Sequence, residues 1–285
     1  MIKKKLKTSF HKNWLHQLDL AEKRQDRIWF NYLYKEQNKV IDKFMVSRND
    51  IDPQGQFKLK DLENMYINLY TNIGMTMGKW YLKTFKNYIK KQNPDYEILW
   101  SAKFAYMGEK TSLLRIEGIA NTQKKQAFGY MSKLVRDPEF QALNERQAEK
   151  ILRKKAKHIS IVDAKRIVRT ESVNAANYAT NQSAIDIFGV DNLQKEWIAT
   201  PDDRVRASHI AASGQIRNMS EPFRVGGEDL DRPGDSSGSA KNVINCRCTS
   251  APFPKEVPGE RGRSLIDDLI IGGSAAILIN EVTEN

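Results

Sequence analysis

The two cysteines of this chain lie one residue apart. Cys246 and Cys248 occur in the segment NCRC, and the sequence of 285 residues contains no others. In an extended segment, residues i and i+2 point to the same side, so both thiols would face one direction. A disulfide between such close neighbours would be strained. Two interpretations remain open: joint ligation of a metal ion, or packing of two small buried side chains.

Zinc is the metal that these residue types indicate, because it takes thiolate and imidazole ligands in a tetrahedral shell. His209, in the segment DDRVRASH, is the expected third ligand beside Cys246 and Cys248. The sequence does not identify a fourth ligand, although Asp203 and Asp235 are candidates, and the two-residue gap usual between zinc cysteines is absent. Under either interpretation, we expect the thiols to hold a loop-rich domain together.

Arginines and acids occur in several short segments of the same half. The segment RTESVNAANYA places Asn174 and Asn177 on one predicted helix with charged residues, and RPGD at residues 232–235 predicts a turn. The arginines could bind phosphate through their bidentate guanidinium groups. We favour a buried ionic network, because acidic partners occur in the same segments. Its expected members are Arg169, Glu171, Asp203, Arg206, Asp235 and Arg247.

The positive charge of the chain is concentrated in its first part. The net charge is +11; residues 1–160 carry 32 Lys and Arg against 17 Asp and Glu, whereas residues 161–285 carry 14 against 18. Such asymmetry predicts that the N-terminal part works near a polyanion, with an attraction that salt weakens. Solvated helix faces are the alternative interpretation. The densest clusters, the expected DNA contacts, are Lys3, Lys4, Lys5, Lys7, Arg153, Lys154, Lys155 and Lys157.

The first half of the chain has the pattern of long amphipathic helices. Apolar and aromatic residues recur at steps of three, four and seven over residues 10–46 and 59–91. A third helical run passes through Trp100, and a shorter helical segment is expected at residues 111–119. The aromatic side chains could stack on bases, but at helical spacing we expect them to form the core.

The predicted secondary structure changes from helices to strands and loops near residue 190. Before it, one helix is expected over residues 138–157, and Ser160 is expected to be the N-cap of another over residues 161–188 that closes at Gly189. After it, residues 193–200 alternate like a strand, followed by segments rich in Gly, Pro, Ser and Asp. The predicted fold class is α+β: a mainly α-helical N-terminal part with long amphipathic helices, then a small loop-rich mixed α/β C-terminal domain.

Four short motifs follow one another between about residues 164 and 252. They are RTE on the predicted helix, DDRVRASH after a strand with a tryptophan, RPGD after a phenylalanine, and INCRC. In this order they resemble the minor head proteins of tailed bacteriophages typified by the F protein of phage Mu. Two positions depart from the usual pattern: Val205 replaces a small polar residue, and AASG precedes Gly214 where a polar residue before the glycine is more common.

The resemblance implies a minor capsid protein of a tailed bacteriophage that acts in head morphogenesis. It implies attachment to the portal protein during procapsid assembly and a position inside the head near packaged double-stranded DNA, which would be contacted without sequence preference. Capsid or scaffolding proteins are further expected partners, and the host cytoplasm is the expected location during assembly. The expected division is a basic helical domain at 1–160, a Mu F-like domain at 161–254, and a linker with an apolar tail at 255–285.

No membrane association and no secretion are expected. The N-terminus lacks the apolar run of a signal peptide. The longest apolar stretch, residues 269–279, is about half as long as the roughly 20 residues that a membrane-spanning helix needs.

An enzymatic alternative remains open, in which Glu171, Asp203 and His209 form a metal-dependent hydrolase or nuclease. The sequence contains no nucleophile elbow and no helix-borne metal motif. We therefore expect a structural protein without catalytic residues.

Overall fold

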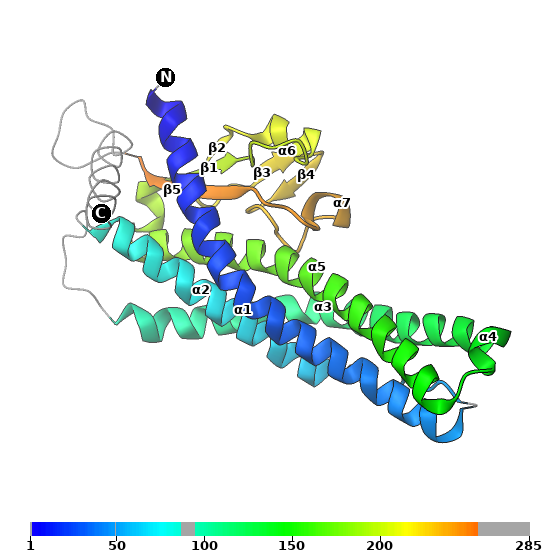
Figure 1. The fold of residues 1–285 in the computed structure, drawn as a ribbon. Coiled ribbons are helices and arrows are strands. Elements are labelled where there is room, and N and C mark those ends of the chain that lie inside the picture. The colour runs from blue at the N-terminus through cyan, green and yellow to red at the C-terminus, as the bar shows by residue number, and fades with distance from the viewer. Residues whose placement is uncertain (1, 49, 87–94, 256–285) are drawn as a thin grey trace, which may run out of the picture.

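The computed structural model consists of long helices with a small layer of strands on one side (Figure 1). It describes residues 2–48, 50–86 and 95–255. The expected apolar tail lies outside these described residues. None of the helices in the described ranges has the length and apolar character needed to cross a membrane.

The described part of the chain begins with long helices, and strands occur only after residue 192. The helices are α1 (Ile2–Ser47), α2 (Leu59–Thr84), α3 (Tyr96–Val135), α4 (Pro138–Gln141), α5 (Glu145–Phe188), α6 (Ala207–Ala212) and α7 (Ala240–Val243), with a 3-10 turn η2 at Val190–Asn192. The strands are β1 (Leu193–Ile198), β2 (Ile216–Asn218), β3 (Phe223–Val225), β4 (Glu228–Leu230) and β5 (Thr249–Pro254). The predicted α+β fold class is confirmed.

Two predicted helix boundaries are wrong. The separate segment expected at residues 111–119 belongs to α3, which continues without a break to Val135. Ser160 is not an N-cap, because it is buried in the middle of α5. That helix begins instead after Asn144, which forms a capping box with Gln147, and it ends at Gly189 as predicted.

The helices α2 and α3 pack closely because glycines leave room for aromatic rings. A Cβ atom added to Gly74 or Gly78 would collide with the ring of Phe104 or Trp100, respectively. At Gly108 the same atom would lie 2.9 Å from the backbone of Ile67 on α2. Most of the large aromatic side chains of the helices are buried in the core, which confirms the packing predicted from their spacing.

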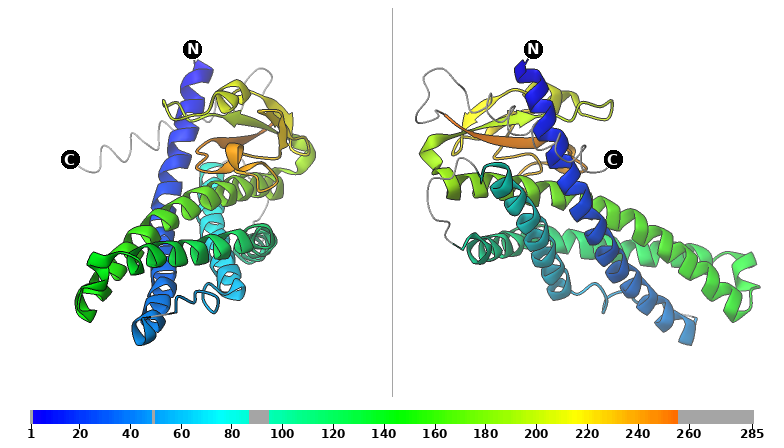
Figure 2. Two further views of the ribbon diagram at one scale, coloured as in Figure 1. Left: turned by 90° about the vertical axis from the view of Figure 1, so that its right-hand side faces the viewer. Right: turned by 60° about the vertical axis from the view of Figure 1, so that its left-hand side comes forward.

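Helix α5 is shared by the two parts of the molecule. It packs against α1, α2 and α3, and it also contacts β1 and β5. Figure 2 shows the strands stacked over the C-terminal half of this helix, while its N-terminal half extends away from them. The prediction that this helix packs against both parts is confirmed. The expected boundary at residues 160–161 falls within the continuous helix.

The strands form two small antiparallel sheets. The order in the larger sheet is β2-β1-β5, and Trp197 of β1 pairs with Ser250 of β5. The smaller sheet is the hairpin β3-β4, whose turn contains Gly226 and Gly227 at φ +57° and +85°. Both φ values lie in the left-handed region, which glycine adopts without strain. Loops make up most of the described residues after β1.

Candidate functional site

A stripe of polar side chains on α5 receives the loops of the C-terminal part. We call Thr170, Asn174, Asn177 and Asn181 the polar stripe; their spacing of four, three and four residues places them on one face of the helix. Each of them hydrogen-bonds a residue between Arg232 and Ser250. Because the donors and acceptors lie far apart in sequence, the stripe fixes several loops at once.

Asn177 has the densest set of these contacts. It is fully buried. Its Nδ2 donates to the carbonyl oxygens of Pro233 at 3.1 Å and Cys248 at 3.2 Å. Its Oδ1 accepts from the backbone N–H of Ser250 at 2.7 Å and from the hydroxyl of Thr249 at 3.2 Å. One side chain thus joins the RPGD turn to the segment that enters β5.

A chain of buried hydrogen bonds continues from the stripe into the helical core. The Arg232 Nε donates to Asn174 Oδ1 at 2.9 Å, and Asn174 Nδ2 donates to the Tyr70 hydroxyl at 2.8 Å. That hydroxyl donates to Glu171 Oε2 at 2.9 Å. Burial raises the pKa of the Glu171 carboxyl, while Arg115 at 4.0 Å lowers it. Glu171 is therefore part of a buried hydrogen-bond network inside the protein.

The RPGD turn lies directly against the backbone of α5. Gly234 has φ +82°, and a Cβ atom there would lie 2.9 Å from the backbone nitrogen of Asn174. Asp235 holds the turn by accepting hydrogen bonds from the backbone N–H groups of Asp231 at 2.9 Å and Ser237 at 3.1 Å. A glycine is needed here for its conformation and for the close approach.

The second and fourth motifs are linked by a separate set of contacts. Arg247 forms an ion pair with Asp202, and its Nη2 donates to the Oδ1 atom of Asp202 at 2.8 Å. The Thr200 hydroxyl donates to the Arg247 carbonyl at 2.6 Å, and Arg206 donates to the carbonyl of Ile244. The side-chain hydrogen bond from Arg247 holds the pKa of Asp202 below its usual range.

The expected ionic network has a different composition. Arg169 pairs with Glu22 of α1 at 2.7 Å rather than with Glu171. Arg247 pairs with Asp202 rather than with Asp203, which is exposed, and Arg206 binds a backbone carbonyl. The pairing predicted among the six residues is therefore wrong, although the motifs that contain them do meet.

Sequence reasoning also missed several members of the site. They are Tyr70, Thr170, Asn181, Asp202 and Arg232. The spacing of the polar stripe within an alanine-rich helix was a usable signal for Thr170 and Asn181. Tyr70 has no local signal, because its partners are about a hundred residues away.

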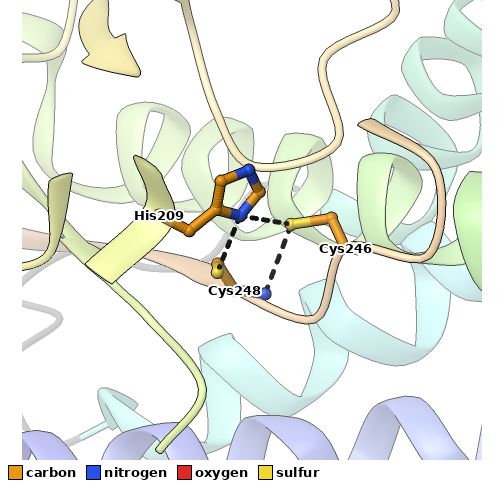
Figure 3. Close-up of side chains that lie close together, drawn as sticks. All are labelled: His209, Cys246 and Cys248. Carbon is orange, nitrogen blue, oxygen red and sulfur yellow. Dashed lines mark hydrogen bonds between the residues drawn. The ribbon is translucent and has the colours of Figure 1, made fainter. Parts of the chain in front are cut away.

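The three expected metal ligands converge in the folded chain. The Nδ1 atom of His209 lies 3.4 Å from Cys248 Sγ and 3.7 Å from Cys246 Sγ, and Figure 3 shows the ring turned toward both sulfurs. All three side chains are buried, each at 1% exposure. Hydrogen bonding between the two thiols lowers the pKa of Cys248 and raises that of Cys246. Neither Asp203 nor Asp235 belongs to this cluster.

The basic clusters have divided roles. The side chains of Lys3, Lys4, Lys5 and Lys7 lie outside the described part of the structure. In the second cluster, Lys154, Lys155 and Lys157 are exposed on α5. Arg153 instead pairs with Asp42 of α1 at 2.6 Å and with Glu149 at 2.7 Å, so it helps to hold α5 against α1.

Glu171, Asp203 and His209, the residues of the enzymatic alternative, lie apart in the described structure. Among the described residues, only His209, Cys246 and Cys248 form a group of three or more side chains close enough to share a metal ion. Glu171 lies in the network with Tyr70, and Asp203 lies in an exposed turn. The three residues proposed for that alternative therefore do not form a joint metal site.

Comparison with known proteins finds similarity in this region. Residues 135–251 match the profile of a family described as Phage Mu protein F like protein. Over 114 residues the chain is 31% identical to the minor head protein GP7 of Bacillus phage SPP1. This alignment covers 40% of this chain and 37% of that protein. Over 93 residues it is 31% identical to NAD(+)--arginine ADP-ribosyltransferase EFV of Enterococcus faecalis. That alignment covers 32% of this chain and 19% of the relative. No solved structure matches the chain.

The chain thus spans less than two fifths of the length of either relative. The matched family region starts at the end of α3 and extends into β5, so it contains the polar stripe, the RPGD turn and the cluster of His209 with the two cysteines. Residues 135–251 thus match the Phage Mu protein F like family and are similar to a phage minor head protein, which confirms the resemblance that the motifs predicted.

Proposed function

We propose that this protein is a minor capsid protein that acts in head morphogenesis of a tailed bacteriophage, bound to the portal on the inner side of the head. The observation that carries the proposal is the family match over residues 135–251, which contain α5 and the strands β1 and β5 that contact it. The similarity to a protein named as a minor head protein supports the same role. Capsid or scaffolding proteins are further partners in this proposal.

No catalytic role is part of this proposal. Glu171 is held by Tyr70 in the buried network, and the ring of His209 faces two thiols. Both side chains therefore have positions suited to stabilising the fold. The activity named for the second relative is that of a protein of which the alignment covers 19%, and it is not transferred to this chain.

The test of the proposed function is the composition of particles made from the phage genome that encodes the chain. We expect the protein in purified heads, in few copies and in contact with the portal when the particle is cross-linked. Deleting the gene should reduce the yield of infectious particles, and supplying the gene in trans should restore it. Heads that contain DNA but lack the protein, with an unchanged yield after deletion, would refute the role.

Non-specific contact with DNA is expected from the exposed lysines of α5. Changing Lys154, Lys155 and Lys157 to Glu should weaken the retention of double-stranded DNA by roughly tenfold to a hundredfold at low salt, because each phosphate contact releases counterions. Retention by the unchanged protein should fall steeply with salt and show no sequence preference. Filter binding at several salt concentrations measures both properties.

The matched control changes the same amount of charge in another place. Arg204, Arg224 and Lys241 are exposed in the C-terminal part, where their ion pairs contribute little to stability. Changing these three residues to Glu should leave most of the retention intact. Equal losses in the two triple variants, or retention that does not depend on salt, would contradict a DNA-facing surface on α5.

A further inference from the structure

We propose that His209, Cys246 and Cys248 bind one zinc ion, which fastens α6 to the segment that enters β5. The proposal rests on the geometry of the three side chains and does not depend on the phage role. The ligands come from two segments separated by 37 residues in sequence, and their donor atoms all lie within 4.8 Å of one another. Nitrogen and sulfur donors of this kind are the set that zinc prefers.

The distances fit a tetrahedral ion. Zinc binds sulfur at about 2.3 Å and imidazole nitrogen at about 2.0–2.1 Å, so two such ligands at the tetrahedral angle are about 3.6 Å apart. The distances from His209 Nδ1 to the sulfurs of Cys248 and Cys246 are 3.4 and 3.7 Å. One ion could therefore bind all three atoms with little movement of the side chains.

Without a metal ion, the two thiols near Nδ1 of His209 cannot both hydrogen-bond to it. A neutral imidazole nitrogen has one lone pair, so only one of the two thiols can donate a hydrogen bond to Nδ1 of His209. The other ring nitrogen, Nε2, is buried without a hydrogen-bond partner in the described structure. A metal ion would bind Nδ1 and both sulfurs at once and would leave the proton of the neutral ring on Nε2.

The charges of such a site also suit its burial. Two thiolates and one neutral imidazole around Zn²⁺ have no net charge, which reduces the cost of placing them away from water. The backbone N–H of Cys248 also donates to the Cys246 sulfur at 3.5 Å. Within the cluster the protein supplies three ligands, so we expect water or another small donor at the fourth position.

The ion would stabilise a region with little core of its own. His209 lies on α6, a helix of six residues, and the cysteines precede β5. The His209 ring also contacts Trp197 edge to face at 5.5 Å. Zinc would thus connect the insertion between β1 and β2 to the opposite edge of the same sheet.

Metal analysis of the full chain tests this proposal. The protein is purified under reducing conditions without chelator, and we expect about one equivalent of zinc. After zinc is removed, titration of the folded chain with Co²⁺ should give the sulfur-to-cobalt charge-transfer bands and the visible bands of a tetrahedral thiolate site. Zinc below about a tenth of an equivalent together with no such bands on titration would overturn the proposal.

Single substitutions identify the ligands. Cys246→Ser, Cys248→Ser and His209→Gln should each abolish binding of stoichiometric zinc and change the cobalt spectrum, whereas His158→Gln at an exposed position of α5 should change neither. Charge-transfer bands that persist unchanged in both cysteine variants would place the metal elsewhere and refute the site. Cobalt titration of the unchanged chain still tests the site if a variant fails to fold.

Discussion

Asn177→Ala is expected to lower the free energy of unfolding by about 3–5 kcal/mol. The substitution removes the donor for the carbonyls of Pro233 and Cys248 and the acceptor for the backbone N–H of Ser250. Each buried group that loses its partner costs about 1–3 kcal/mol, and Asn177 is fully buried. The loss is large beside the roughly 5–15 kcal/mol that typically stabilises a folded domain.

Urea denaturation followed by circular dichroism measures this effect. The control is Asn121→Ala, the same substitution at an exposed position of α3, for which we expect a change within about 0.5 kcal/mol. If Asn177→Ala were as mild as its control, the side chain could not be the joint between the RPGD turn and β5.

Gly234→Ala is the second substitution with a large expected effect. The backbone at Gly234 has φ +82°, and a new Cβ atom would lie 2.9 Å from the nitrogen and 3.2 Å from the Cα of Asn174. The left-handed conformation costs an alanine about 1–2 kcal/mol, and forcing an extra atom into a packed site costs about 1–3 kcal/mol more. We therefore expect a loss of about 2–5 kcal/mol from these two terms together.

Gly227→Ala separates the two contributions. Gly227 has nearly the same conformation, with φ +85°, but nothing lies within 4 Å of its added Cβ. This variant should lose only the conformational part, about 1–2 kcal/mol. Thermal and urea unfolding of both variants provide the comparison, and equal losses would show that the RPGD turn does not touch α5 as described.

The long helices were predictable because their apolar spacing is regular over many turns. Within α1, for example, Trp14, Trp29 and Phe44 are all buried as predicted. Helix ends were less predictable, since a serine can cap a helix or lie within one. Packing of α5 against other helices buries Ser160, which overrides its local preference. The true start was encoded locally, as the capping box of Asn144 and Gln147.

The site was predictable where its residues lie within the motifs. Cys246, Cys248 and His209 meet as expected because the motifs containing them fold against one another. The ion pairs were not predictable in the same way. The partner of Arg169 is Glu22, far away on α1, and no spacing in the sequence identifies a contact of that range. The same reason conceals the role of Tyr70.

Hydrogen exchange across residues 246–251 tests the central claim most directly, namely that the polar stripe of α5 holds the C-terminal motifs as one unit. In the unchanged protein, the amides of Cys248 and Ser250 should exchange about as slowly as those in the middle of α5. In Asn177→Ala they should exchange roughly a hundredfold or more faster, while amides in α2 and α3 change much less. Rapid exchange of both amides in the unchanged protein would contradict the account.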